Sequence, residues 1–185
     1  MKLSFKGDEF RIMQIADTQE GGKVSPDTLN LINTAIEREK PDLIVYSGDQ
    51  IWGKASFNGN AEKVERVLRE LTYPAVSRKI PFAICFGNHD RQVGLTNREQ
   101  FAIYKKIDCF VGESEPGIDG CANQVIEIAD GDEPKFLLYL IDSHSSLSIG
   151  YDNVHANQIE WYQSVRDNYE RKYGHVINSI VIQHI

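Results

Sequence analysis

The chain has 185 residues, of which 41% are hydrophobic and 10% aromatic, and this composition is typical of one globular domain with a buried core. Its formal net charge is −7, from 27 acidic and 20 basic residues that are scattered rather than grouped in blocks. This charge argues against general binding to nucleic acids or anionic membranes. An anionic substrate would therefore need a local positive centre, such as a metal ion.

Apolar runs of strand length alternate with stretches of helical periodicity, which predicts an α/β fold built from βαβ units. We expect a single domain over residues 1–185, without internal repeats or a linker. The predicted strands are 10–16, 43–46, 80–86, 124–129, 136–141 and 176–182. The turn formers in 111–123 predict a loop before an edge strand.

Four helices are predicted between the strands. The first begins with Ser25 as N-cap and Pro26 at the first helical position, and runs up to Lys40. The second starts at Asn60 and is expected to stop before Pro74. The other two are predicted over 97–106 and 157–169.

Three cysteines are an odd number, and they show no Cys-x-x-Cys spacing, so neither a disulfide framework nor a thiolate zinc site is indicated. The N-terminal residues lead into charged sequence without a hydrophobic signal segment, and no apolar run approaches the ~18 residues of a membrane helix. We expect a soluble, cytoplasmic protein.

Polar residues follow five predicted strands at the same end. They are Asp17, Asp49, Asn88, Asp142 and His184. In open α/β sheets, ligands bind outside the carboxyl ends of the strands, so these side chains are expected to converge in one crevice.

A pair of divalent ions needs a bridging carboxylate, further oxygen or imidazole ligands, and open positions for water and substrate. Asp49 is the natural bridge, because it lies between the two other ligand-bearing strands, and the preceding Gly48 lets the backbone turn tightly so that its carboxylate can point into the site. Asp17 would bind the first metal and Asn88 the second. Taken singly, each residue also fits a polar turn or a helix cap. Their combination favours a metal site.

Four blocks together resemble the ordered motifs of the calcineurin-like metallophosphoesterases. They are Asp17-Thr18-Gln19, Gly48-Asp49, Gly87-Asn88-His89-Asp90 and Gln183-His184. The segments 41–49, 141–143, 151–152 and 158–162 resemble the branch related to purple acid phosphatases. The resemblance covers nearly the whole chain and implies a β-sandwich of mixed sheets flanked by helices. It also implies two divalent metal ions (Mn, Fe or Zn) that hydrolyse phosphate esters.

The resemblance also implies roles for single residues. Asp17 binds the first metal, Asp49 bridges both, and Asn88 and His184 bind the second. His89 faces the substrate as an acid or transition-state stabiliser, because an imidazole can give a proton to the leaving oxygen. A metal-bound hydroxide would attack phosphorus in line.

Two features depart from the family pattern. Gln19 stands where the family usually has a histidine, and an amide oxygen coordinates the first metal more weakly than an imidazole does. Trp52 stands where purple acid phosphatases have a tyrosine, and its side chain cannot ligate a metal. The family's final Gly-His-x-His block would lie beyond His184. We therefore expect the N-terminal part of a longer enzyme, with a domain incomplete at its C-terminus and sheet edges that favour self-association.

For several polar residues two interpretations stay open. Asp90 either orients His89 or caps the following helix, and Arg91 contacts either phosphate or solvent. His144 either lines the substrate side or ends a strand, whereas His155 is expected at a loop or helix end.

The leading function is metal-dependent hydrolysis of a phosphorylated substrate. The alternative is a non-catalytic binding module with a degenerate metal site, which Gln19 and the missing imidazoles would explain. A Rossmann-type nucleotide binder is disfavoured, since no Gly-x-Gly-x-x-Gly follows the first strand. Monoesters, nucleotide diesters and phosphoproteins present the same phosphorus, so the loops at 50–60, 91–97 and 143–156 would decide among them.

Overall fold

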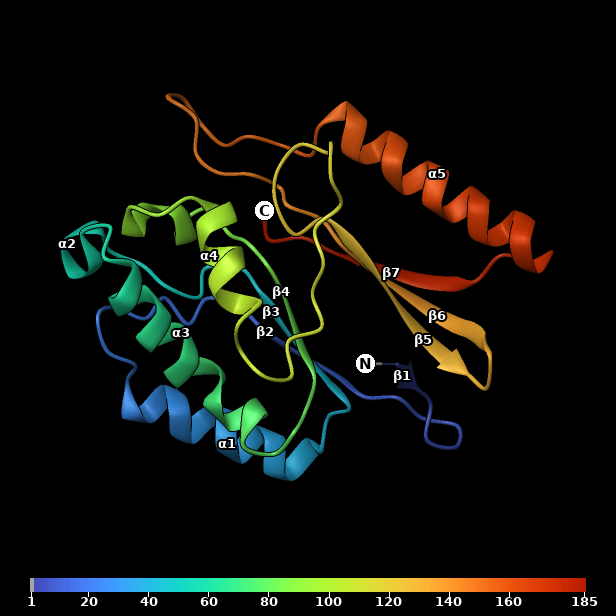
Figure 1. Ribbon diagram of the computed structural model, residues 1–185, viewed down its shortest axis with the longest axis horizontal. Helices are drawn as coiled ribbons and strands as arrows, with labels where there is room; N and C mark the ends of the chain where they lie inside the picture. The colour runs from blue at the N-terminus through green and yellow to red at the C-terminus, as the bar shows by residue number, and fades with distance from the viewer. Residues whose placement is uncertain (1) are drawn as a thin grey trace.

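Two β-sheets face each other in the centre of the molecule, and helices cover the outer side of each (Figure 1). The structure is a computed structural model that describes residues 2–185. The first sheet has the order β2-β3-β4 and is parallel throughout, whereas the second has the order β1-β5-β6-β7 and is mixed. The strands are β1 Leu3–Ser4, β2 Ile12–Ile15, β3 Leu43–Ser47, β4 Phe82–Cys85, β5 Gln124–Asp130, β6 Glu133–Leu140 and β7 Asn178–Ile182.

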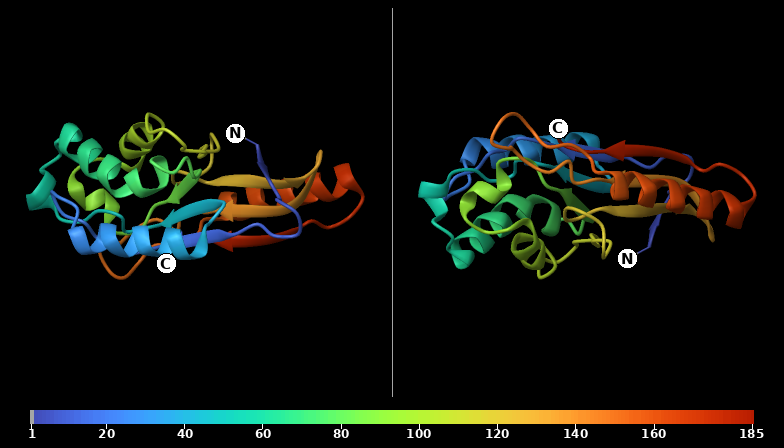
Figure 2. Two further views of the ribbon diagram at one scale, coloured as in Figure 1. Left: turned by 90° about the horizontal axis from the view of Figure 1, so that it is seen from below. Right: turned by 90° about the horizontal axis from the view of Figure 1, so that it is seen from above.

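The helices lie on opposite sides of this sandwich, as the two views of Figure 2 show. They are α1 Pro26–Glu39, α2 Lys54–Phe57, α3 Ala61–Val76, α4 Asn97–Tyr104 and α5 Ala156–Tyr173, with a short 3-10 helix η1 over Asp90–Val93. Helices α1, α3 and α4 pack on the outer face of the first sheet, and α5 packs on the outer face of the second. The expected sandwich of mixed sheets flanked by helices is therefore confirmed.

Successive side chains of a strand point to opposite faces of its sheet, so alternate residues of β3 belong to two different hydrophobic clusters. Val45 of β3 points between the sheets and packs in one cluster with Ile126 and Leu138, whereas its neighbour Tyr46 points outward into the cluster that contains Leu71 of α3. All five residues of β3 are buried, because both faces of its sheet are covered. This explains why the strand reads as a continuous apolar run and not as an alternating pattern.

The predicted helix starts are confirmed by their caps. The Ser25 side chain accepts a hydrogen bond from Asp27 N at 3.2 Å, and the Asn60 side chain accepts one from Lys63 N at 2.8 Å. Both caps satisfy amide groups that have no partner inside the helix.

Two sequence predictions about element boundaries were wrong. Helix α3 continues through Pro74 to Val76, because a proline so near the helix end removes only one hydrogen bond while its ring stays buried in the core. Strand β5 is not an edge strand, since β1 pairs with it in parallel. A two-residue strand such as β1 is too short to leave a period in the sequence.

Strand β7 forms one edge of the second sheet, and Ile180 and Val181 are 48% and 42% exposed there. The expected self-association through uncovered edges stays a prediction, as does the cytoplasmic location. Within residues 2–185, no helix is both long enough and apolar enough to cross a membrane.

Asp42 ties the N-terminal segment to the start of β3. Its carboxylate accepts hydrogen bonds from Lys6 Nζ at 2.8 Å and from Arg11 N at 2.9 Å. Partial burial by itself raises the pKa of this carboxyl, but the two donors outweigh it and hold the pKa below its ordinary value.

Candidate metal centre

The loops that follow β2 and β3 run side by side. Asp17 N donates to Gly48 O at 3.1 Å, and Gln19 N donates to Asp49 O at 2.9 Å. Asp17, Gln19 and Asp49 have φ values of 56°, 44° and 55°, in the left-handed region that residues other than glycine rarely occupy. Such strain persists only where the surrounding structure enforces it, and it is typical of functional sites.

The carboxylate of Asp90 joins the loops after β3 and β4. It is fully buried, and it accepts hydrogen bonds from the backbone N–H groups of Asp49 at 2.9 Å, Gln50 at 2.8 Å, Ile51 at 3.2 Å and Gly87 at 2.8 Å. Burial raises the pKa of Asp90 to about 7, although the amide donors act in the opposite direction. Both sequence interpretations of Asp90 were therefore wrong, because its partners are backbone amides and not the His89 ring or a helix end.

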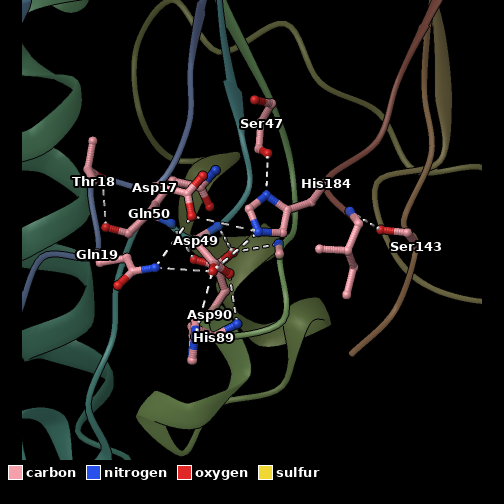
Figure 3. A network of polar contacts seen from close by, with 12 residues as sticks. Asp17, Thr18, Gln19, Ser47, Asp49, Gln50, His89, Asp90, Ser143 and His184 are labelled. Atoms are coloured by element: carbon pink, nitrogen blue, oxygen red, sulfur yellow. Dashed lines mark hydrogen bonds and ion pairs between the residues drawn. The ribbon is translucent and has the colours of Figure 1, made fainter. Parts of the chain in front are cut away.

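Asp17, Asp49 and His184 form a compact cluster (Figure 3). His184 Nε2 lies 3.2 Å from Asp49 Oδ2 and 4.0 Å from Asp17 Oδ1. The side chains of Asp49 and His184 are only 2% and 8% exposed, whereas that of Asp17 is 54% exposed. The cluster thus opens to solvent on the Asp17 side.

Hydrogen bonding determines which nitrogen of His184 faces the carboxylates. Nδ1 lies 2.9 Å from Ser47 O, and a carbonyl oxygen can only accept, so Nδ1 carries a hydrogen. In a neutral imidazole, Nε2 then presents a lone pair to the Asp49 carboxylate. Two acceptors face each other at this distance only if a cation or a proton lies between them, so the geometry fits a metal ion.

His89 lies beside this cluster and contacts it through its backbone N–H, whereas its ring makes no hydrogen bond to it (Figure 3). Its backbone N donates to Asp49 Oδ1 at 2.8 Å, while its ring Nε2 is 3.9 Å from Asp49 Oδ2, too far for a hydrogen bond. Ring Nδ1 is buried and has no hydrogen-bond partner among residues 2–185. The ring packs edge-on against Trp52, with centroids 5.9 Å apart. This imidazole is held in position but free to bind another group.

The two neutral amides among the candidate ligands behave differently. Gln19 Nε2 lies 3.4 Å from Asp17 Oδ1 and 3.5 Å from Asp49 Oδ2, so the amide group reaches both carboxylates. Asn88 is buried in the turn before His89, and its backbone oxygen accepts from Ser145 Oγ at 3.2 Å. Within residues 2–185, no hydrogen bond links the Asn88 side chain to the other candidate ligands.

The sequence model of the family described as calcineurin-like phosphoesterase matches residues 10–185. The chain belongs to this family. The resemblance inferred from the strand-end motifs is confirmed.

Relatives of this calcineurin-like phosphoesterase include purple acid phosphatase-related proteins. "Phosphatase DCR2" of Saccharomyces cerevisiae is 27% identical over 86% of this chain and 32% of its own length. "Probable inactive purple acid phosphatase 14" of Arabidopsis thaliana is 29% identical over 88% of this chain and 48% of its own. The chain therefore spans half or less of the length of these two relatives.

A crystal structure of a dimetal phosphatase from Danio rerio has the same fold, with a TM-score of 0.64 over 95% of this chain and 69% of the other. The two sequences are 16% identical, so the likeness supports the fold alone.

The prediction that all five strand-end residues converge was wrong for Asp142. Its carboxylate accepts hydrogen bonds from Cys121 N at 2.8 Å and from His144 N at 2.9 Å, and so it holds two loops together. This phosphoesterase also has a cavity of about 320 Å³ whose lining includes Arg91, Arg98 and His144. The sequence did not indicate Arg98, because an exposed arginine on a helix leaves no distinguishing pattern.

Proposed function

We propose that this calcineurin-like phosphoesterase hydrolyses phosphate esters with two divalent metal ions. Asp17, Asp49 and Gln19 would hold the first ion, and Asp49, Asn88 and His184 the second. The observation that carries the proposal is the position of His184 Nε2, which faces the buried Asp49 carboxylate at 3.2 Å. Imidazole and carboxylate ligands of this kind suit Mn, Fe or Zn.

The residues around the ions have separate tasks. Bound divalent ions lower the pKa of a water ligand and offset the charge that develops on the phosphate. Asp49 is kept in place by the His89 amide and by the contact of its own N–H with Asp90. The unengaged ring of His89 would donate a proton to the leaving oxygen, and Trp52 restricts the movement of that ring.

The cavity of about 320 Å³ supports an anionic substrate. Arg91 and Arg98 both line it, in a chain whose formal net charge is −7. Arginine side chains recognise phosphate oxygens with two parallel donors. The substrate would therefore place its phosphate on the metal ions and further polar groups in this cavity.

A second candidate function is a binding module that has lost catalysis. Two observations favour it: Arabidopsis relatives carry the name "Probable inactive purple acid phosphatase", and Gln19 offers an amide where an imidazole would bind more strongly.

Metal analysis combined with turnover of p-nitrophenyl phosphate separates these functions. For the enzyme, we expect metal in the wild-type chain, and in Asp49→Asn a loss of metal with a fall in turnover of at least about 100-fold. Asp132→Asn is the matched control, because that side chain is fully exposed. A wild-type chain that binds no Mn, Fe or Zn and shows no turnover would support the binding module.

A further inference from the structure

A second cluster of metal-ligating side chains shares no residue with the centre described above. His144, Asp152 and His155 each offer one donor atom, and these atoms lie within 4.8 Å of one another. His144 belongs to the segment after β6, Asp152 to the loop before α5, and His155 is the N-cap residue of α5. The three side chains are partly buried.

Hydrogen bonds determine the tautomer of His144. Gln158 is fully buried, and its Nε2 donates to Asn123 Oδ1 at 2.8 Å and to Asp142 O at 2.7 Å. Its oxygen Oε1 is therefore the atom that lies 2.9 Å from His144 Nε2. An amide oxygen only accepts, so His144 Nε2 carries the hydrogen, and in the neutral imidazole Nδ1 keeps a lone pair.

His155 has the surroundings of a metal-binding histidine. Its Nε2 lies 3.2 Å from Asp152 Oδ1, and two ligands that are each ~2.0–2.1 Å from a tetrahedral ion lie about 3.3 Å apart. Its other nitrogen, Nδ1, lies 2.8 Å from Asp119 Oδ2. A carboxylate behind the imidazole is the usual second partner of a histidine that ligates a metal.

The two histidine rings are stacked, with centroids 4.0 Å apart and planes inclined by 22°. Two positively charged rings would repel each other at this separation, so the stacking favours a pair with at least one neutral ring. The neutral imidazole is also the form that binds metal. The carboxylates of Asp119 and Asp152 would offset the charge of a cation at this position, and they also face the positive end of the α5 dipole.

We propose that His144 Nδ1, His155 Nε2 and Asp152 Oδ1 bind one divalent ion of the Zn²⁺ class. Asp119 orients His155, and a fourth position stays open to water. Two imidazoles and one carboxylate suit Zn²⁺, Co²⁺ or Ni²⁺ better than Mg²⁺ or Ca²⁺. Such an ion would hold the segment after β6 against the start of α5, beside the cavity that His144 lines.

Zn²⁺ binding by the full 185-residue chain tests this site. The chain is stripped with a chelator, and bound Zn²⁺ per chain is measured by equilibrium dialysis. We expect His155→Ala to bind one equivalent less than the wild type, whereas His175→Ala, which removes an exposed histidine elsewhere, binds the same amount. Equal Zn²⁺ stoichiometry in the wild type and His155→Ala, at every concentration, would overturn the proposal.

An Asp49→Asn variant keeps this test independent of the proposed function. It loses the ligand that the other centre depends on, yet the site at His155 should still take up one Zn²⁺. If the wild type has no metal at Asp49 but still binds one Zn²⁺ through His155, the phosphatase proposal fails and the second site stands. An Asp49→Asn chain that takes up no Zn²⁺ would overturn the second site.

The Asp119→Asn variant tests the site with little risk of misfolding, since the change is isosteric and this side chain does not ligate the ion. We expect Zn²⁺ binding at this site to weaken about 10–100-fold without disappearing. Co²⁺ bound in the Asp49→Asn background should give visible ligand-field absorption, and Asp152→Asn in that background should abolish it. Unchanged Zn²⁺ affinity in Asp119→Asn, or an unchanged Co²⁺ spectrum in Asp152→Asn, would show that these residues form ion pairs only.

Discussion

Replacing Gly87 by alanine should damage the metal centre through steric overlap with a single residue, Asp49. An added Cβ would lie 2.2 Å from Asp49 Oδ1 and 2.5 Å from Asp49 N. Ordinary contact begins near 3.4 Å, so Asp49 would have to move by about 1.2 Å. Gly87 does not have a left-handed φ, so the backbone conformation itself accepts alanine.

The structure leaves Asp49 little room to move. Its amide N donates to Asp90 at 2.9 Å, and its Oδ1 accepts from His89 N at 2.8 Å. Overpacking costs about 1–3 kcal/mol, and a lost hydrogen bond to a charged group costs about 1.5–3 kcal/mol. We therefore expect Gly87→Ala to lower the free energy of unfolding by about 2.5–6 kcal/mol. A displacement of about 1 Å should also lower turnover about 100-fold.

Three measurements on the same preparation check this prediction: urea unfolding, metal content per chain, and hydrolysis of p-nitrophenyl phosphate. Gly21→Ala is the matched control, because Gly21 does not have a left-handed φ either and an added Cβ would lie 3.6 Å from Ser56 Oγ, which is an ordinary contact. If Gly87→Ala keeps wild-type metal content and turnover, the close packing of Gly87 against Asp49 does not position the site, and the reasoning is refuted.

Three further predictions concern the first metal, acid stability and the core. Gln19→His should tighten binding of the first metal at least about tenfold in a chelator competition, because imidazole is the stronger ligand for borderline metals; unchanged affinity would contradict coordination at this position. Asp42→Asn should lower the free energy of unfolding by about 1.5 kcal/mol at pH 7. Because the folded pKa of Asp42 is lowered, its contribution is present above the unfolded pKa and is lost as the pH falls through the folded pKa. Urea titrations should thus show a smaller difference near about pH 3, and an equal difference at both pH values would count against this linkage. Leu71→Ala, at a fully buried position, should cost about 2–5 kcal/mol in the same assay, whereas Leu31→Ala, at a position 71% exposed, should cost less than about 0.5 kcal/mol; similar costs would contradict the packing of α3 on the first sheet.

Much of the candidate site could be predicted because its residues follow strands. Asp17 and Asp49 follow neighbouring parallel strands, whose carboxyl ends share one edge of the sheet. Each could therefore be predicted from a short apolar run and the polar residue that follows it. His184 was predicted in the same way from the end of β7, although that strand belongs to the other sheet. Asp142 shows the limit of this reasoning, because its carboxylate turns toward the amides of Cys121 and His144.

The second cluster could not be predicted from the pattern. Asp119 and His144 lie on segments without periodicity, and the paths of such loops depend on what they pack against. The separation of three residues between Asp152 and His155 was the only local signal, and it is common among unrelated sequences. The burial of Gln158, which orients His144, depends on how α5 packs on the second sheet.

The sequence by itself determined the family, the alternation of strands and helices, and which polar residues stand at the strand ends, because these follow from short-range periodicity and from motifs of adjacent residues. Only the tertiary structure decided that Asp90 binds four backbone amides, that Nε2 of His184 faces Asp49, and that His144 and His155 stack. These features depend on contacts between residues far apart in the chain, and the direction of a side chain across such a contact is set by packing and hydrogen bonding, not by local sequence.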